Sequence, residues 1–251
     1  MCTTLILAGP PGHLLLLGNR DELRTRSPAL PPEPGQRALF PIDADALGTW
    51  TGVNAHGLAL SLLNNYQADA VHAPELPILS RGILTRDLLD ARDPGEVASR
   101  IQAKPDLLTR VRPFILAAVG APVGQDARAV LVTWTGVALS CEPLELPALL
   151  ISSGYDLAGV STARTEELRD LLDATWSGDA DHAYALSERF GSPGVAHTAH
   201  TLFMSRDDAR TVSHTRVEVA SHSARLSYTG VPPHSTLSNA PTHARALERV
   251  A

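Results

Sequence analysis

The second residue of the chain is a cysteine, in the opening Met1-Cys2-Thr3-Thr4. An initiator methionine is normally trimmed when the next residue is small, so we expect the mature chain to begin at Cys2. One residue would then carry both a thiol and a free α-amino group. Because a thiol has a pKa of about 8.5 and an α-amine one of about 7.7 to 8.0, the neutral amine can accept the thiol proton, directly or through one water. Cys2 is therefore a candidate nucleophile with its own base. The alternative is a chance cysteine in a frayed terminus, which the apolar run directly after it disfavours.

A second polar group, Asn19-Arg20-Asp21-Glu22, follows an apolar run that reads as a strand. Side chains alternate along a strand, so Asn19 and Asp21 share one face and Arg20 and Glu22 the other. If the first two strands form a hairpin, this group returns close to Cys2. Asp21 could then hold the α-amine, and Arg20 could orient an anionic or carbonyl substrate. Four polar residues at a strand end also fit a solvated turn.

The remaining candidates are weaker. Asn64-Asn65-Tyr66 ends a buried strand, where the Asn64 amide could hold an oxyanion, although Asn-Asn is also ordinary turn chemistry. The spacing of His197 and His200 could support a metal, but no cluster of Cys, Asp or Glu accompanies them, so we expect no metal site. Cys141 lies in an apolar run and is expected in the core.

The elements that must position these residues begin with a hairpin of residues 3–8 and 14–17, joined by a Pro/Gly turn and apolar on both faces. Burial on both faces implies layers above and below the sheet. The same patterns predict further strands at 48–53, 57–63, 114–119, 129–134, 137–141, 201–204, 210–219 and 224–228. They predict helices after Ser80 and Pro94, at 166–172, at 181–190 and after Thr242, and a loop over 27–41. Strands in runs, with helices grouped between them, indicate an α+β fold, and residues 1–251 show no linker or repeat that would divide them.

Composition excludes several classes of protein. The chain is 44% hydrophobic and 19% charged and has no apolar run of about 18 residues, which predicts a soluble globular protein without a membrane span. Its net charge of −6, without a basic block, argues against a nucleic-acid binder. Two cysteines and a start without a basic region favour the cytoplasm.

Several landmarks occur in a characteristic order: Met1-Cys2-Thr3, Asn19-Arg20-Asp21-Glu22 with Arg26, Gly48-Thr49-Trp50-Thr51-Gly52, Gly57-Leu58 leading to Asn64-Asn65-Tyr66, and Ser80-Arg81-Gly82. In this they resemble the NRDE family, also called the transport and Golgi organisation protein 2 family. The rest of the chain follows the family more loosely, through 155–163 and 201–204. The family in turn is similar to the N-terminal nucleophile hydrolases of the penicillin V acylase and bile salt hydrolase type. Those enzymes begin Met-Cys-Thr and form a four-layer αββα sandwich, which is the fold the resemblance implies.

The resemblance also implies roles for individual residues. Cys2 would be the nucleophile, Asp21 would hold the α-amine, and Asn64 would supply the oxyanion hole. The substrate would be bound by residues around them: Asn19, Arg20, Glu22, Trp50, Asn65 and Thr162. The chain departs from the acylases at two places, because Ser161-Thr162-Ala163 stands where they carry a second asparagine and Thr198 falls near their late arginine.

Two functions from different classes fit these residues. In the first, the protein is an amidohydrolase that cleaves the C–N bond of a linear amide of a small acyl substrate and needs no cofactor. In the second, the same pocket carries haem, a lipid or an acyl-CoA without catalysis, and Cys2 is at most a contact. Only the first requires removal of Met1. A plain interaction protein is a third possibility, for which the acidic surface offers no specific support.

Overall fold

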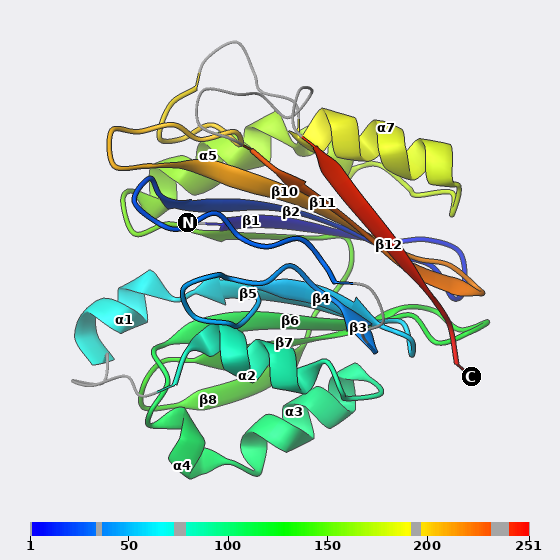
Figure 1. Ribbon diagram of the computed structural model, residues 1–251, viewed down its shortest axis with the longest axis horizontal. Coiled ribbons are helices and arrows are strands. Elements are labelled where there is room, and N and C mark those ends of the chain that lie inside the picture. Colours follow the sequence, from blue (N-terminus) through cyan, green and yellow to red (C-terminus); the bar gives the residue numbers. More distant parts are fainter. Residues whose placement is uncertain (1, 34–36, 73–78, 192–196, 232–240, 251) are drawn as a thin grey trace.

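The computed structural model describes residues 2–33, 37–72, 79–191, 197–231 and 241–250. Two six-stranded antiparallel sheets pack face to face, and helices cover the outer face of each, giving four layers in the order αββα (Figure 1). The α+β sandwich expected from the sequence is confirmed.

The first sheet contains both strands of the N-terminal hairpin, and each of them is paired on both sides. Its strands lie in the order β12 (Thr242–Glu248), β11 (Ser223–Gly230), β10 (Ala209–Val219), β2 (Leu14–Leu23), β1 (Cys2–Ala8) and β9 (Ala148–Ser152). Strand β2 continues to Leu23, so the polar group at 19–22 lies inside the strand, whereas the sequence indicated a position at its end. Strand β1 pairs with β2 as far as Arg20, and β10 continues the pairing to Leu23, which supplies the backbone hydrogen bonds that extend the strand.

The second sheet is a simple meander. Its strands follow chain order as β3 (Ala38–Leu39), β4 (Thr51–Asn54), β5 (Leu58–Asn64), β6 (Phe114–Gly120), β7 (Arg128–Trp134) and β8 (Leu139–Pro143). The two-residue strand β3 interrupts the stretch that we expected to be loop throughout.

Helices lie on both outer faces. Those on the first sheet are α5 (Leu157–Glu167), α6 (Arg169–Leu172) and α7 (Ala180–Gly191), and those on the second are α2 (Arg81–Leu88), α3 (Pro94–Gln102) and α4 (Pro105–Leu108) (Figure 1). A further helix, α1 (Tyr66–His72), follows β5. Three of the described helices have side-chain caps at their starts: Ser80 accepts from the Gly82 amide, Asp93 from the Glu96 amide, and Asp156 from the Gly159 amide. No helix in the described ranges is both long and apolar enough to cross a membrane.

Alternation along β1 divides the apolar side chains between two cores. Ile6 belongs to the core between the sheets, whereas Leu5 and Leu7 belong to the core under α5, α6 and α7. A third core fills the space between the second sheet and α2 to α4. The hairpin lies between the first two of these cores, which explains why it is apolar on both faces.

Three expectations about elements were wrong. Residues 201–204 form no strand: Leu202 is buried in the core under the helices, so its apolar character reflects packing of an irregular segment. The segment after Thr242 is not a helix but strand β12, because the edge of β11 offers it backbone partners. The predicted helix at 166–172 is divided, since α5 begins at Leu157 behind an Asp156 cap and α6 begins at Arg169.

Candidate active site

Cys2 opens strand β1 at one end of the interface between the two sheets. It lies opposite Arg20 of β2 and Ser152 of β9, so the three side chains share one face of the sheet. Two residues further on, Thr4 is hydrogen-bonded to Ser61 of β5 over 2.7 Å, which identifies this face as the one turned toward the second sheet. Cys2 is half-buried, and it borders a cavity of about 230 Å³.

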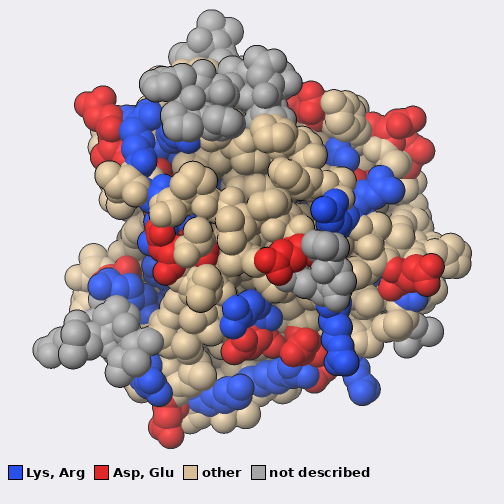
Figure 2. Space-filling model, viewed as in Figure 1, with Lys and Arg blue, Asp and Glu red and all other residues tan. Residues whose placement is uncertain are grey.

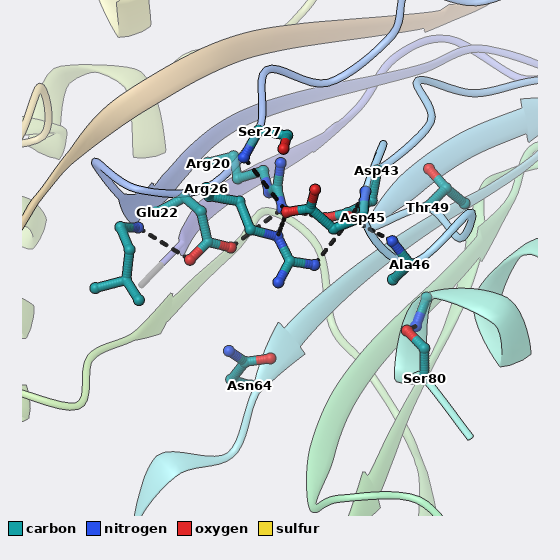
Figure 3. A network of polar contacts seen from close by, with 12 residues as sticks. Arg20, Glu22, Arg26, Ser27, Asp43, Asp45, Ala46, Thr49, Asn64 and Ser80 are labelled. Carbon is teal, nitrogen blue, oxygen red and sulfur yellow. Dashed lines mark hydrogen bonds and ion pairs between the residues drawn. The ribbon is translucent and has the colours of Figure 1, made fainter. Parts of the chain in front are cut away.

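Arg20 forms one wall of this cavity. Its guanidinium lies 2.5 Å from an oxygen of Asp43 and 3.1 Å from one of Glu22, and its central carbon is 4.2 Å from the centre of the Trp50 ring. Because both carboxylates and the ring engage it, Arg20 is held in one position. Figure 3 shows this network, with Asn64 standing apart from it on β5.

Asp43 joins Arg20 to the loop that crosses the site. It accepts a hydrogen bond from Arg26 over 2.8 Å and further bonds from the backbone amides of Asp45 and Ala46 (Figure 3). Burial alone would raise the pKa of the Asp43 carboxyl, but Arg26 and Arg20 together hold it below its ordinary value. Asp43 is therefore an ionised anchor for two arginines.

The opposite face of β2 carries a second network, directed to the helices. Asp21 pairs with Arg164 of α5 over 2.9 Å, and both side chains are completely buried. Asp21 also accepts from the Thr211 hydroxyl over 2.6 Å, and Arg164 donates to the Thr3 hydroxyl. Asp21 nevertheless borders the Cys2 cavity. Asp21 thus lies between the cavity and the buried guanidinium of Arg164.

Asn19 lies deeper on the same face as Asp21. It is hydrogen-bonded to His214 over 2.9 Å and to the Leu202 carbonyl, and His214 contacts the Ser187 hydroxyl of α7 over 2.7 Å. Burial lowers the pKa of His214 to about 3, so its imidazole is neutral. Asn19 serves this buried network and does not line the cavity.

The electrostatics of the thiol favour its protonated form. Burial raises the pKa of Cys2, and the carboxylates of Asp21 and Glu22 act in the same direction. Arg20 opposes them, but the net shift is upward. A protonated thiol is a poor nucleophile, so attack at neutral pH requires a base close by.

Asn64 lies at the end of β5, across the sheet interface from Cys2. Its side-chain nitrogen donates to the Tyr66 hydroxyl over 2.9 Å, and its backbone oxygen accepts from the Ser152 hydroxyl over 2.6 Å. An amide nitrogen carries two N–H groups, so a second donor remains for a ligand. The neighbouring Asn65 instead accepts from the Ala68 amide at the start of α1.

The structure brings together six of the residues singled out from the sequence around the cavity: Cys2, Arg20, Asp21, Glu22, Trp50 and Asn64. It leaves Asn19 and Asn65 elsewhere. Thr162 is exposed on α5 and Thr198 lies in the loop before β10, so neither side chain lines the cavity. A second oxyanion donor would have to come from another group.

Sequence reasoning missed Arg164. The signal was present, because Val160, Arg164 and Leu168 are spaced by four residues, and all three are fully buried. An arginine on the apolar face of a helix needs a buried anion, and Asp21 is that anion. Asp43 carried no such signal, since its role depends on a loop conformation.

The loop before β4 comes to the cavity through close backbone contact. A Cβ atom at Gly48 would lie 2.3 Å from the Gly82 carbonyl carbon, and the Thr49 amide donates to the Gly82 carbonyl over 2.9 Å. Two glycines let this loop pack against the start of α2, which brings Ser80 and Trp50 to the same cavity. Over the described residues, no three of the side chains His, Cys, Asp and Glu gather in an arrangement that could hold a metal ion.

Solved structures share this architecture at low sequence identity. The Caenorhabditis elegans N-acylethanolamine-hydrolyzing acid amidase ortholog is 16% identical, covers 97% of this chain and 99% of its own, and superposes with a TM-score of 0.52. A variant of the conjugated bile acid hydrolase from Clostridium perfringens is 12% identical, with coverages of 98% and 96% and a TM-score of 0.53. Both have the N-terminal nucleophile hydrolase fold, and so does this chain.

Sequence comparison identifies the family. No curated protein matches the chain. The model of the family described as Transport and Golgi organisation 2 matches residues 1–145, more than half of the 251 residues and the part that contains Cys2, the strand β2 group and Asn64. The chain therefore belongs to the Transport and Golgi organisation 2 family.

Proposed function

We propose that the protein is an amidohydrolase that uses Cys2 as an N-terminal nucleophile on a linear amide of a small acyl substrate. The observation that carries the proposal is the position of Cys2, at the start of an inner strand and at a polar cavity that Asp21 and Asn64 also border. The similar solved structures support it, since one is an N-acylethanolamine-hydrolyzing amidase and the other a conjugated bile acid hydrolase.

The base would be the α-amine of Cys2 after removal of Met1. Burial keeps the thiol protonated at neutral pH, so a base on the same residue would supply what the surroundings do not. Asp21, which Arg164 and Thr211 hold in place, is suited to orient that amine. The mature chain would then span the fold from Cys2 as one domain.

The reaction would proceed in two steps. The α-amine takes the thiol proton, the sulfur attacks the amide carbonyl, and Asn64 donates to the resulting oxyanion. When the C–N bond breaks, the leaving amine takes the proton from the α-ammonium and a thioester remains. Water, deprotonated by the same amine, then hydrolyses the thioester and regenerates the thiol. Arg20 and Trp50 would form the wall against which the substrate lies.

The first experiment is intact mass spectrometry before and after a small thiol-reactive electrophile at neutral pH. The Cys141→Ser variant removes the other cysteine and is the background for all measurements. We expect Met1 to be absent and Cys2 to be labelled much faster than a model thiol. Retention of Met1, or labelling no faster than the model thiol, would overturn the proposed base.

A panel of N-acyl amides then tests the activity itself. We expect Cys2→Ala to abolish turnover, Cys141→Ser to leave it unchanged, and Asn64→Ala to lower kcat by about 10²–10³-fold, as for other single oxyanion donors. Hydrolysis that survives Cys2→Ala would exclude the mechanism. A protein with an unreactive Cys2 that takes up haem or an acyl-CoA would instead support the non-catalytic carrier.

A further inference from the structure

The start of helix α2 brings a third arginine to the Cys2 cavity. Arg81 is the first residue of the helix, and it borders the cavity together with Ser80 and Gly82 on either side of it. Its side chain is 18% exposed, so it is largely withdrawn from bulk water. Charges interact more strongly in such surroundings than in water, so this cation can influence which compounds enter the cavity.

Carboxylates already neutralise the other two arginines of the cavity, Arg20 and Arg26. Asp43 pairs with both of them, over 2.5 and 2.8 Å. Glu22 adds a second partner to Arg20, and Asp45 adds one to Arg26. An anionic ligand would have to compete with these carboxylates for either guanidinium.

The charge of Arg81 is balanced less completely. The described carboxylate closest to its guanidinium is that of Asp69, at 3.9 Å, and Asp69 is itself bonded to Arg112 over 3.1 Å. Burial lowers the pKa of Arg81, and Asp69 offsets only part of this effect. Among the described residues the guanidinium donates to one acceptor, the Pro113 carbonyl, over 2.9 Å. Because a guanidinium carries five N–H groups, donors remain for a ligand.

One peptide group, Asn64–Asn65, relates Arg81 to the nucleophile. The N–H of this peptide and Arg81 both donate to the Pro113 carbonyl, over 3.3 and 2.9 Å, so the guanidinium lies next to the peptide. The carbonyl oxygen of the peptide accepts from the Ser152 hydroxyl over 2.6 Å, and Ser152 is the strand partner of Cys2. The N–H and C=O of a trans peptide point in opposite directions. The end of β5 therefore stands between Arg81 on one side and the strand position of Cys2 on the other.

The cavity suits a short and polar compound. Its volume of about 230 Å³ is below the range of about 300 to 1,000 Å³ that is usual for larger organic ligands. The chain has a net charge of −6, and on the face shown in Figure 2 its Lys and Arg side chains lie beside Asp and Glu side chains. The field of the whole molecule does not favour anions, so a preference for an anion at Cys2 would be a local property of the cavity.

We propose that Arg81 binds the carboxylate of the substrate, and that this substrate is the monoamide of a short dicarboxylic acid. The part of the proposal that concerns the amide rests on the proposed function. In that reaction the leaving amine takes its proton from the α-amine of Cys2, next to Asp21 on the first sheet. Arg81 lies at the second sheet, beyond Asn64, so the carboxylate belongs to the acyl part of the amide.

Binding is measured in the Cys2→Ala variant, which has no thiol to turn the compound over. The probes are succinamate and succinamide, which have nearly the same shape and differ in the charge of one end, titrated by ligand-observed NMR at neutral pH and low salt. Charge-assisted hydrogen bonds contribute more than neutral ones, so we expect succinamate to bind at least about tenfold more tightly. Arg81→Gln should remove this preference, and Arg81→Lys should retain part of it because the charge stays.

The matched control is Arg100→Gln. Arg100 pairs with Glu96 along α3 and does not border the cavity, so its replacement changes the net charge equally and should leave both affinities unchanged. Succinate, which cannot be hydrolysed, locates the site in the Cys141→Ser chain: it should slow the alkylation of Cys2 by iodoacetamide, and Arg81→Gln should abolish this protection. Circular dichroism checks that every variant is folded, and the comparison of the two probes needs no change at Arg81.

The proposal is overturned if the two probes bind equally, if neither binds, or if Arg81→Gln and Arg100→Gln behave alike. A preference lost in Arg81→Lys as completely as in Arg81→Gln would refute recognition through charge. None of these outcomes depends on activation of the thiol, which the labelling of Cys2 tests separately. A protein that binds succinamate through Arg81 but has an unreactive Cys2 would therefore refute the amidohydrolase and retain the carboxylate site.

Discussion

The buried pair of Asp21 and Arg164 lies directly behind the cavity and can be tested by stability measurements alone. Both side chains are completely buried and their charged atoms lie 2.9 Å apart. Replacing Arg164 by Met removes the cation while the Asp21 carboxylate stays in a site without solvent, and it also removes the donor to Thr3. Breaking a buried pair from one side costs about 3–5 kcal/mol. Since domains are stable by only about 5–15 kcal/mol, we expect a large fall in the free energy of unfolding.

Urea denaturation followed by circular dichroism measures this loss. The matched control is Arg189→Met, which removes the same group from an exposed pair with Asp170 on the same helical layer. Exposed pairs contribute between 0 and about 1 kcal/mol, so the control should differ little from the parent.

A double-mutant cycle separates the pair from its surroundings. We expect Asp21→Asn combined with Arg164→Met to lose less than the sum of the two single variants, by about 2 kcal/mol or more, because the second change removes the unmatched charge that the first one creates. Additive losses, or an Arg164→Met loss no larger than that of Arg189→Met, would refute the reasoning that each charge is held by the other.

Three other predictions follow from local geometry. Burial lowers the pKa of His214 to about 3, whereas the histidine of the unfolded chain takes up its proton near the ordinary value of about 6.5. The free energy of unfolding should therefore fall as the pH drops from about 6.5 toward 3, by at most about 1.4 kcal/mol per pH unit. Urea denaturation across this pH range measures the fall, and His214→Gln should reduce it. A Cβ at Gly48 would collide with the backbone of Gly82, so Gly48→Ala should lower the free energy of unfolding by about 1–3 kcal/mol, measured by thermal unfolding. Gly18→Ala is the control and should lower it far less, because the atom nearest to a Cβ at Gly18 is 3.9 Å away. If Met1 is retained, the raised pKa of Cys2 should make alkylation of the thiol slow at neutral pH and faster in alkaline buffer. Intact mass measured against time gives these rates. Rapid alkylation of a chain that retains Met1 at neutral pH would contradict the raised pKa.

Local patterns in the sequence were enough to predict the arrangement of β2. Because side chains alternate along a strand, Arg20 and Glu22 had to point away from Asn19 and Asp21, and the structure divides them in this way between the cavity and the helices. The apolar character of both faces of the hairpin likewise predicted layers on both sides. The periodicity of 3.6 residues would also have placed Arg164 on the buried face of its helix.

Contacts between distant segments decided the rest. Strands β9 and β12 form because the edges of β1 and β11 offer backbone partners, and no local signal marks such partners. Asn64 and Asn65 are adjacent in sequence, yet the end of β5 sends one to the cavity and the other to the start of α1. Thr162 is separated from the cavity because its helix turns Arg164 inward. Sequence alone therefore determined which residues share a face of a strand or helix. The packing of one sheet on the other decided which of those faces meet at Cys2, because this packing depends on long-range contacts that local periodicity does not encode.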